Sequence, residues 1–389
     1  MMSTRRPLDR LQLFFVRLRS RGFVHTGHTM SAIPRTGTRC ALLSVLVCAL
    51  LVLPHAPTAR AIPKGLRVRS YRSGLNFVID MAWVSGTRKL FFTEKSGRIR
   101  VMVGKRLLSR PCRRLDVNDA GERGALGIVL HPRFKRNHWL YVYYTKASPL
   151  QNRVTRFKVR NNRCRNPKHI VKRIDASSSG YHNGGQLEFV GNKLFVSTGE
   201  AHGPSAAQNR RNRLGKVLRY NADGSIPKGN PFSRPGNRNP VWSYGHRNPF
   251  GLTHKPNSKK LYETENGPSC DDEFNIIRKG RNYGWGGGYS CGTAGVGPNP
   301  KSPLRRWSNI IVPTDPWWYK GKLRKLNGDI YMGDFRNRLH RIRLNGKGTR
   351  LRFDRVIHRA PDGIVDVTKG PGRVLYFATP NTIYRIVRR

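Results

Sequence analysis

Acidic residues are scarce in this chain. Its 389 residues include 21 Asp and Glu against 74 Lys and Arg, which gives a formal net charge of +53. Such a balance attracts polyanions, for example nucleic acid, anionic lipid headgroups or acidic cell-wall polymers. The basic residues are spread evenly from Arg67 to Arg389, however, and no specific nucleic-acid motif concentrates them. An arginine bias on solvated strand faces is the simpler interpretation, and an acidic polymer as partner is the alternative.

Long apolar runs are also missing, apart from one near the N-terminus. Residues 40–53 form one apolar run, but about 14 residues are too few for a comfortable membrane span. Arg35 and Arg39 precede it and Ala59-Arg60-Ala61 follows it, which is typical of a signal peptide with an A-x-A cleavage site. We expect residues 1–61 to be a signal peptide, with Met30 as a candidate true start. The protein is then secreted, periplasmic or in the cell envelope; an uncleaved N-terminal anchor is the alternative.

Cysteines are few, and no pair has the C-x-x-C spacing, which argues against a zinc site. Two of the six lie in the expected signal peptide. The remaining four, an even number in an exported chain, predict two disulfides. Three pairings are possible, and the local one is favoured: Cys112–Cys164 and Cys270–Cys291.

Helical periodicity is scarce, while short β-type runs bounded by Gly, Asn and Pro recur. Six such units span residues 89–103, 138–159, 184–227, 241–285, 326–345 and 363–387. A repeat of roughly 40–55 residues with several strands per unit is typical of a β-propeller blade. We therefore predict an all-β fold: one six-bladed β-propeller with four-stranded antiparallel blades over residues 62–389. Gly65–Ser73 is expected to close the ring, and a β-sandwich or two all-β domains is the alternative.

Loops from every blade of a propeller converge around the central axis, so residues far apart in sequence can meet at one mouth. His182, in Tyr181–Gly185, and Arg247, in Gly245–Gly251, lie on two such loops. An imidazole titrates near neutrality, which suits a general base. The alternative for His182 is a histidine that fixes a turn, and for Arg247 an ion pair between blades.

Six ordered motifs, extended by Arg281–Trp285, cover nearly all of residues 75–387. They are Gly121–Ile128 with His131–Phe134, Tyr181–Gly185, Gly215–Arg219, Asp223–Pro227, Gly245–Pro249 and Asp271–Ile276. In this order the chain resembles the glucose/sorbosone dehydrogenase family. The resemblance implies a propeller that oxidises sugars or related alcohols by hydride transfer to pyrroloquinoline quinone (PQQ), with Ca²⁺ and an external electron acceptor.

The resemblance also implies roles for single residues. His182 matches the general base, Arg247 matches an arginine that stabilises charge at the quinone oxygens, and Asn248 matches a cofactor contact. Gly267 and Pro268 match the turn whose backbone carbonyls hold Ca²⁺, an ion that prefers oxygen ligands.

A second, structural Ca²⁺ is expected at Asp271, Asp272 and Glu273. The alternative is that these acids pair with arginines in a basic chain.

Three positions depart from the family's pattern. Arg123 stands where a glutamine is usual, and Arg336 or Arg338 stands near a lysine that binds a PQQ carboxylate, for which a guanidinium fork is a substitute. Gly363-Ile364-Val365 replaces an Arg-x-Arg pair. Each lost charge-assisted hydrogen bond is worth on the order of 1.5–3 kcal/mol, so loss of both partners would weaken PQQ binding by several powers of ten, of which Arg123, Arg336 and Arg338 could restore a part.

These departures leave the function open between classes. The leading hypothesis is a PQQ-dependent sugar dehydrogenase. The first alternative is a non-catalytic propeller, as in the hedgehog-interacting proteins, which binds an acidic extracellular polymer or protein. The second is a lactonase-like hydrolase with Ca²⁺ in the mouth.

Overall fold

The computed structural model describes residues 62–389, which form six antiparallel sheets. The first three sheets, in chain order, contain β2 (Val78–Trp83), β3 (Lys89–Glu94), β4 (Arg98–Val103) and β5 (Arg106–Leu107), with β6 (Arg113–Arg114) paired to β4; β7 (Ala125–Leu130), β8 (Trp139–Lys146), β9 (Gln151–Arg160) and β10 (Arg163–Asp175); and β11 (Gly184–Val190), β12 (Lys193–Thr198), β13 (Lys216–Asn221) and β14 (Val241–Tyr244).

The last three sheets follow the same plan. They contain β15 (Pro249–His254), β16 (Leu261–Glu265), β17 (Asp272–Ile277) and β18 (Arg305–Trp307); β19 (Pro313–Trp318), β20 (Ile330–Asp334), β21 (Arg338–Leu344) and β22 (Leu351–Arg359); and β23 (Asp366–Lys369), β24 (Leu375–Ala378), β25 (Ile383–Arg388) and β1 (Leu66–Arg72). Helical turns are short: α2 (Phe134–Asn137), α3 (Pro204–Gln208), η2 (Arg324–Leu326) and η3 (Pro371–Arg373). In the described residues no helix is long and apolar enough to cross a membrane.

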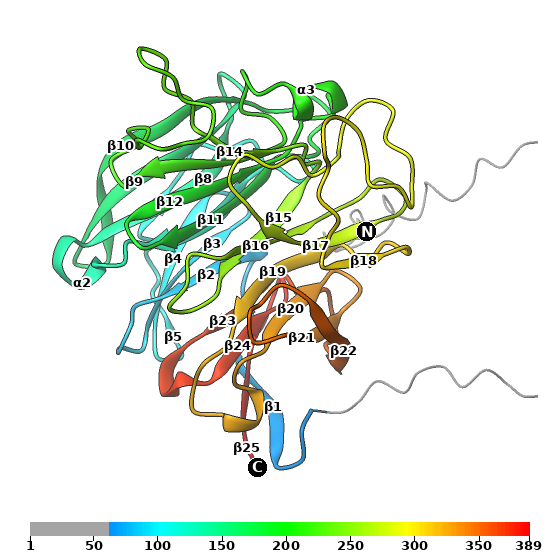
Figure 1. The fold of residues 1–389 in the computed structure, drawn as a ribbon. Coiled ribbons are helices and arrows are strands. Elements are labelled where there is room, and N and C mark those ends of the chain that lie inside the picture. Colours follow the sequence, from blue (N-terminus) through cyan, green and yellow to red (C-terminus); the bar gives the residue numbers. More distant parts are fainter. Residues whose placement is uncertain (1–61) are drawn as a thin grey trace, which may run out of the picture. The chain divides into compact units, whose positions relative to one another are not determined.

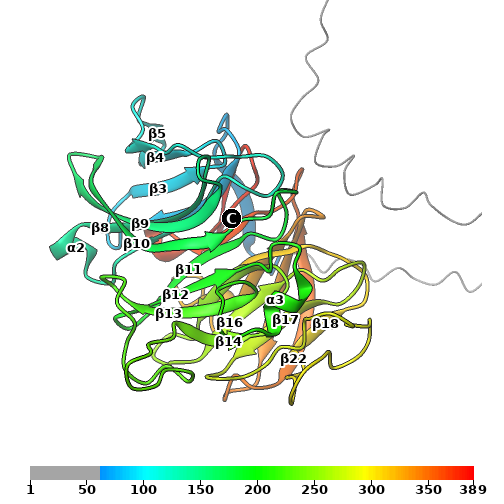
Figure 2. The same cartoon turned by 90° about the horizontal axis from the view of Figure 1, so that it is seen from above.

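The sheets form a closed ring, the predicted six-bladed β-propeller (Figures 1 and 2). Their innermost strands β2, β7, β11, β15, β19 and β23 contact one another in turn, and β23 contacts β2 again. The blue strand β1 pairs antiparallel with the red strand β25, from Leu66 opposite Arg388 to Arg72 opposite Ile383 (Figure 1). The expected closing strand in Gly65–Ser73 is thereby confirmed.

The hydrophobic core is divided among the boundaries between blades. Six buried clusters occur in residues 62–389, and each joins two successive sheets. Phe91 of β3 and Ile128 of β7 belong to the cluster between the first two sheets, for example. Because each sheet packs against neighbours on both faces, its central strands carry consecutive buried residues, as in β3 and β8, and the loops lie at the rims.

Two details of the expected units differ from the structure. Residues 241–244 form β14, the outer strand of the third sheet, so the fourth blade begins at Pro249 and not at Val241. Strand β10 has 13 residues and lies after the end of the second expected unit. Most of its residues are exposed, so its sequence does not show the alternation that would predict a strand. The expected signal peptide at residues 1–61 lies outside the described residues.

Both favoured disulfides are confirmed. Cys112–Cys164 connects the segment before β6 with β10 and so ties the first blade to the second. Cys270–Cys291 closes the loop that follows β16 and contains the Gly267 turn.

Candidate active site

Loops at the N-terminal ends of the innermost strands meet at one mouth of the propeller. His182 lies two residues before β11, and Arg247 lies two residues before β15. Both loops are fixed to the segment after β12. The backbone N–H of Glu200 donates to the carbonyl of Arg247 at 2.9 Å, and that of Ala201 donates to the carbonyl of His182 at 3.1 Å. The two residues with predicted catalytic roles therefore share one site.

Glu122 joins a third loop to this pair. Its Oε2 accepts the backbone N–H of His182 at 2.8 Å and the side-chain amide of Asn248 at 2.9 Å. The amide oxygen of Asn248 in turn accepts the backbone N–H of Gly184 at 3.2 Å. Asn248, the expected cofactor contact, thus has both ends of its amide occupied by protein groups and positions the His182 loop.

The ring of His182 is oriented by a carboxylate. Its Nδ1 lies 2.5 Å from Oε1 of Glu200, and since a carboxylate only accepts hydrogen bonds, Nδ1 carries the proton. Within residues 62–389 no partner is bonded to Nε2, which is then the basic nitrogen. His202 packs edge-on against the ring, with 4.2 Å between ring centroids. One nitrogen is oriented by a carboxylate and the other is able to accept a proton, which is the arrangement of a general base.

Two neighbouring histidines have opposite protonation states. Burial lowers the pKa of His182 below its ordinary value; the hydrogen bond with Glu200 opposes this shift, and the charge of Arg247 adds to it. Burial alone would also lower the pKa of His246, but Glu263 and Glu265 raise it to about 10. At neutral pH His182 is therefore a neutral base, while His246 is a buried cation that pairs with acids beneath the site.

Arg247 is the fixed cation of the mouth. Its Nη1 donates to the carbonyls of Asn266 at 3.0 Å and Gly267 at 2.7 Å. The guanidinium lies over the ring of Trp285, 5.3 Å from the centroid, and the backbone N–H donates to Glu265. A guanidinium held in this way can act on developing negative charge without reorganising.

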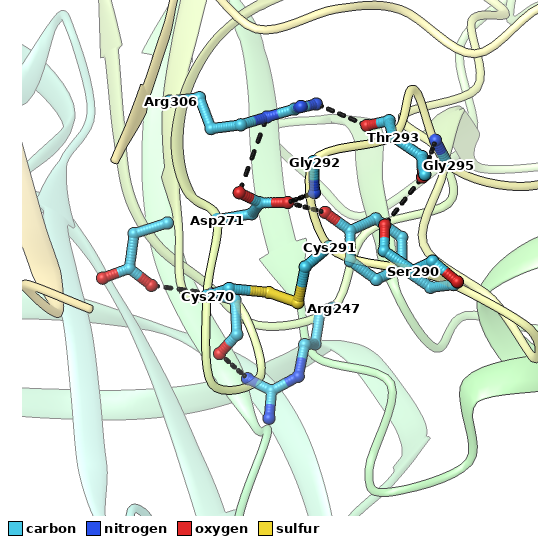
Figure 3. The surroundings of a disulfide bond; sticks show 12 residues. Arg247, Cys270, Asp271, Ser290, Cys291, Gly292, Thr293, Gly295 and Arg306 are labelled. Atoms are coloured by element: carbon cyan, nitrogen blue, oxygen red, sulfur yellow. Dashed lines mark hydrogen bonds and ion pairs between the residues drawn. A yellow bond between two sulfur atoms is a disulfide. The ribbon is translucent and has the colours of Figure 1, made fainter. Parts of the chain in front are cut away.

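The turn with Gly267 and Pro268 is tightly constrained. The N–H of Gly267 donates to Oδ1 of Asp272 at 2.8 Å. A Cβ at Gly267 would lie 1.9 Å from the carbonyl oxygen of Cys270, so only glycine fits there. The Cys270–Cys291 disulfide lies beside this turn, close to Arg247 (Figure 3). The Gly267 carbonyl, an expected Ca²⁺ ligand, is thus held rigidly and faces a cationic side chain.

The three consecutive acids after the disulfide do not gather at one point. Asp271 accepts the Tyr289 hydroxyl at 2.8 Å and the Gly292 N–H at 2.5 Å (Figure 3). Burial raises the pKa of Glu273 to about 8, with nearby Glu265 adding to the shift. Among the described residues, Asp271, Asp272 and Glu273 form no cluster with metal-ligand spacing. The structure therefore gives the expected second Ca²⁺ no assembled ligand set.

The three arginines expected to bind cofactor lie in different surroundings. Arg123 is buried, and its guanidinium donates to the backbone carbonyls of Ala120 and Ser177 at 3.2 Å each. Arg338 forms an ion pair with Asp334, with Nε 2.5 Å from Oδ2. Arg336 donates to the carbonyl of Ile310 at 2.7 Å and is exposed. Of the three, only Arg336 has a guanidinium left largely open to solvent.

The segment Gly363–Val365 cannot replace the two absent arginines. Ile364 is fully buried, and Val365 is 8% exposed. They belong to the clusters between the fifth and sixth blades and between the sixth and first blades. The positions at which the resemblance expects two cations are therefore occupied by core packing.

Sequence analysis missed the acids that organise the site, namely Glu122, Glu200 and Glu265. Glu200 follows β12 and Glu265 ends β16, which are the second strands of adjacent sheets. A sequence signal existed for Glu200 and Glu265, because each is an acid at or just after the end of a buried strand in a chain with few acids.

Removing the site disulfide tests how strongly the Gly267 turn depends on it. The double variant C270S/C291S opens a loop of 21 residues and is expected to lose about 3 kcal/mol of unfolding free energy. The control C112S/C164S opens 52 residues and is expected to lose about 4 kcal/mol. If the carbonyls of the Gly267 turn bind Ca²⁺, only the first pair should weaken this binding, as measured by titration of the folded variants. Equal weakening by both pairs would contradict a local role.

The chain is a six-bladed propeller. Its mouth holds an oriented imidazole and a fixed guanidinium, an arrangement that is typical of propellers with an active site. A family model described as Glucose / Sorbosone dehydrogenase matches residues 75–388. The chain belongs to this family.

Relatives agree with this assignment. Aldose sugar dehydrogenase YliI of Escherichia coli (strain K12) is 32% identical over 243 residues, 58% of this chain and 63% of that protein. The crystal structure of a glucose dehydrogenase from Thermus thermophilus has a TM-score of 0.75 at 31% identity, covering 83% of this chain and 100% of that chain. The PQQ-bound aldose sugar dehydrogenase of Streptomyces coelicolor has a TM-score of 0.72 at 28% identity, covering 84% and 99%.

Proposed function

We propose that this protein is an exported dehydrogenase that oxidises sugars or related alcohols with PQQ and Ca²⁺. The observation that carries the proposal is the His182–Glu200 pair at 2.5 Å beside the guanidinium of Arg247. Family membership agrees with it, and so does the PQQ-bound Streptomyces relative. Two disulfides in the folded chain favour export, because such bonds persist in oxidising compartments. Residues 1–61 are then the signal peptide and residues 62–389 the mature domain.

The residues at the mouth fit PQQ together with Ca²⁺ better than PQQ alone. PQQ carries three carboxylates, and of the three arginines expected to bind them only the exposed Arg336 would be available, while Arg247 would serve the quinone oxygens. Glu122 and Glu200 add negative charge to the same mouth. A divalent cation would offset this repulsion, and the carbonyls of Gly267 and Pro268 are oxygen ligands of the kind that Ca²⁺ prefers.

The chain's own residues would carry the proton chemistry. When bound, PQQ supplies the acceptor for the hydride that leaves the sugar carbon. Nε2 of His182 takes the proton of the sugar hydroxyl, and Glu200 stabilises the imidazolium that forms. Arg247 provides positive charge where negative charge develops on the acceptor.

Replacing Glu200 by glutamine tests the orientation of the base. Since the Glu200 hydrogen bond raises the pKa of His182, E200Q should lower that pKa and move the acid limb of kcat/KM to lower pH. The rate should fall by about 10²-fold. D354N is the control, because Asp354 pairs with His340 at 2.8 Å away from the mouth. A shift of the acid limb to higher pH would contradict the assigned role.

The function itself is tested by titrating the purified protein with PQQ, with and without Ca²⁺, followed by dye reduction with a panel of aldoses. Saturable PQQ binding that requires Ca²⁺, together with sugar-dependent dye reduction, is the expected result. Absence of saturable binding at micromolar PQQ would remove the dehydrogenase proposal.

The alternative is a propeller that binds an acidic extracellular polymer or protein without redox chemistry. The buried Ile364 and Val365 favour this alternative, because they lie where the family has two arginines that bind PQQ. In that case an acidic polysaccharide should bind in a salt-dependent manner while PQQ does not bind at all.

A further inference from the structure

Three aspartates meet at the axis of the propeller, away from the mouth described above. Asp80, Asp315 and Asp366 lie on the innermost strands β2, β19 and β23. Each has a carboxylate oxygen within 4.8 Å of the others, and all three side chains are buried. Asp80 and Asp366 belong to the first and last blades, between which the ring closes.

Within residues 62–389, no basic side chain neutralises this cluster, because none of the ion pairs there includes any of the three aspartates. The chain has 74 basic residues and only 21 acidic ones. This cluster therefore differs from the other acids of the described residues, most of which pair with arginine or histidine.

Backbone amides from neighbouring blades hold two of these carboxylates in place. Asp80 accepts the N–H groups of Met81 and Ile128, both at 2.7 Å. Asp315 accepts the N–H of Leu252 at 3.0 Å. Hydrogen bonds donated to a carboxylate favour its ionised form. Main-chain donors therefore fix the carboxylates of Asp80 and Asp315 in the cluster.

Asp366 provides an independent sign of a missing partner. It is 1% exposed, and neither of its carboxylate oxygens has a hydrogen-bond partner within the described residues. Burying a carboxylate without a partner is costly, and a native structure seldom retains such a group without a proton, water or ion beside it. Its unsatisfied oxygens lie in the same cluster as those of Asp80 and Asp315.

An open cavity leads to the cluster. It has a volume of about 370 Å³ and is lined by the three aspartates and by the later parts of the innermost strands, including Trp83 and Trp317. His182 and Arg247 lie before the first residues of their strands, so the cavity opens toward the opposite end of the axis. It offers room for water molecules to complete a coordination shell.

We propose that Asp80, Asp315 and Asp366 form a second cation site that binds Ca²⁺ on the propeller axis. Carboxylate oxygens with added waters suit this ion, and no histidine or cysteine belongs to the cluster. The bound ion ties the first, fifth and sixth blades together. The site is separate from the Gly267 turn and does not depend on PQQ.

The test uses the mature protein without PQQ, stripped of metal by chelator. Ca²⁺ is titrated by calorimetry, and Tb³⁺ is titrated by tryptophan-sensitised emission. D366N removes one unsatisfied carboxylate at almost unchanged size, and D116N changes an exposed aspartate as the matched control.

Wild type and D116N are expected to bind one more equivalent of Ca²⁺ than D366N. They should also gain melting temperature with Ca²⁺, a gain that D366N loses in large part. Equal stoichiometry in wild type and D366N would overturn the proposal. If D366N does not fold, D315N replaces it with the same expected results, and absence of Ca²⁺ binding by wild type also overturns the proposal. Neither outcome bears on the dehydrogenase, because PQQ is absent.

Discussion

Replacing His182 by asparagine should lower kcat for aldose oxidation by about 10²–10⁴-fold, the range for a lost general base. The reason is that Nε2 of His182 is the basic nitrogen at the mouth, while Nδ1 is held by Glu200. Asparagine is chosen because the backbone at His182 has φ +54°, which asparagine tolerates. PQQ binding should change little, since the imidazole acts on the substrate.

The control is H138N. His138 has nearly the same backbone conformation, with φ +56°, but is exposed at the end of α2. H138N should keep wild-type kcat. The pH profile separates roles further: wild type should lose kcat/KM below an acid limb that lies under the ordinary histidine pKa, and H182N should lack this limb. If H182N retains more than about a tenth of wild-type kcat, His182 is a turn residue and not the base.

Replacing Arg247 by alanine should reduce both catalysis and stability. Loss of a preorganised positive charge is expected to lower kcat by about 10²–10³-fold. Glu122, Glu200 and Glu265 would also lose their shared counter-charge. Since the guanidinium is not fully buried, we expect about 2–3 kcal/mol of lost unfolding free energy, below the value for a fully buried pair.

R247K distinguishes the two effects. Lysine keeps the charge but not the planar group that lies over Trp285 and donates to two carbonyls. It should recover most of the stability and less of kcat. R156A is the control, because Arg156 lies 4.0 Å from the Trp139 centroid away from the mouth, and its kcat should stay at the wild-type level. Parallel recovery of stability and kcat in R247K would make Arg247 a structural residue only.

The fold was largely predictable because a propeller repeats one pattern. Strand pairs such as Lys89–Val103 are short runs rich in apolar residues, and turns between them carry glycine or asparagine. The strand pairings themselves are local, so each blade can be recognised separately. The outer strands were harder: most of β10 is exposed, so packing does not dictate its residues, and β14 is a short buried strand of four residues directly before the loop that leads into the next blade.

The site was predictable only in part. Loop motifs indicated His182, Arg247 and Gly267, and the structure places them at one mouth. The partners of these residues depend on contacts between distant segments, such as Glu122 with Asn248, which no local pattern encodes. The same applies to the axial aspartates, each of which is an isolated acid in its own strand. Arg338 shows the converse, since its ion pair with Asp334 uses the charge that sequence analysis assigned to cofactor.

The central claim is that the mouth around His182 and Arg247 oxidises sugars with bound PQQ. The most direct measurement is anaerobic: protein is loaded with one equivalent of PQQ in the presence of Ca²⁺, mixed with excess aldose, and the absorbance of the bound quinone is followed in a single turnover. We predict that the quinone is reduced by the sugar in wild type and that this step is slowed in H182N at equal PQQ occupancy. PQQ that does not bind, or that binds and stays oxidised in the presence of every aldose tested, would contradict the account.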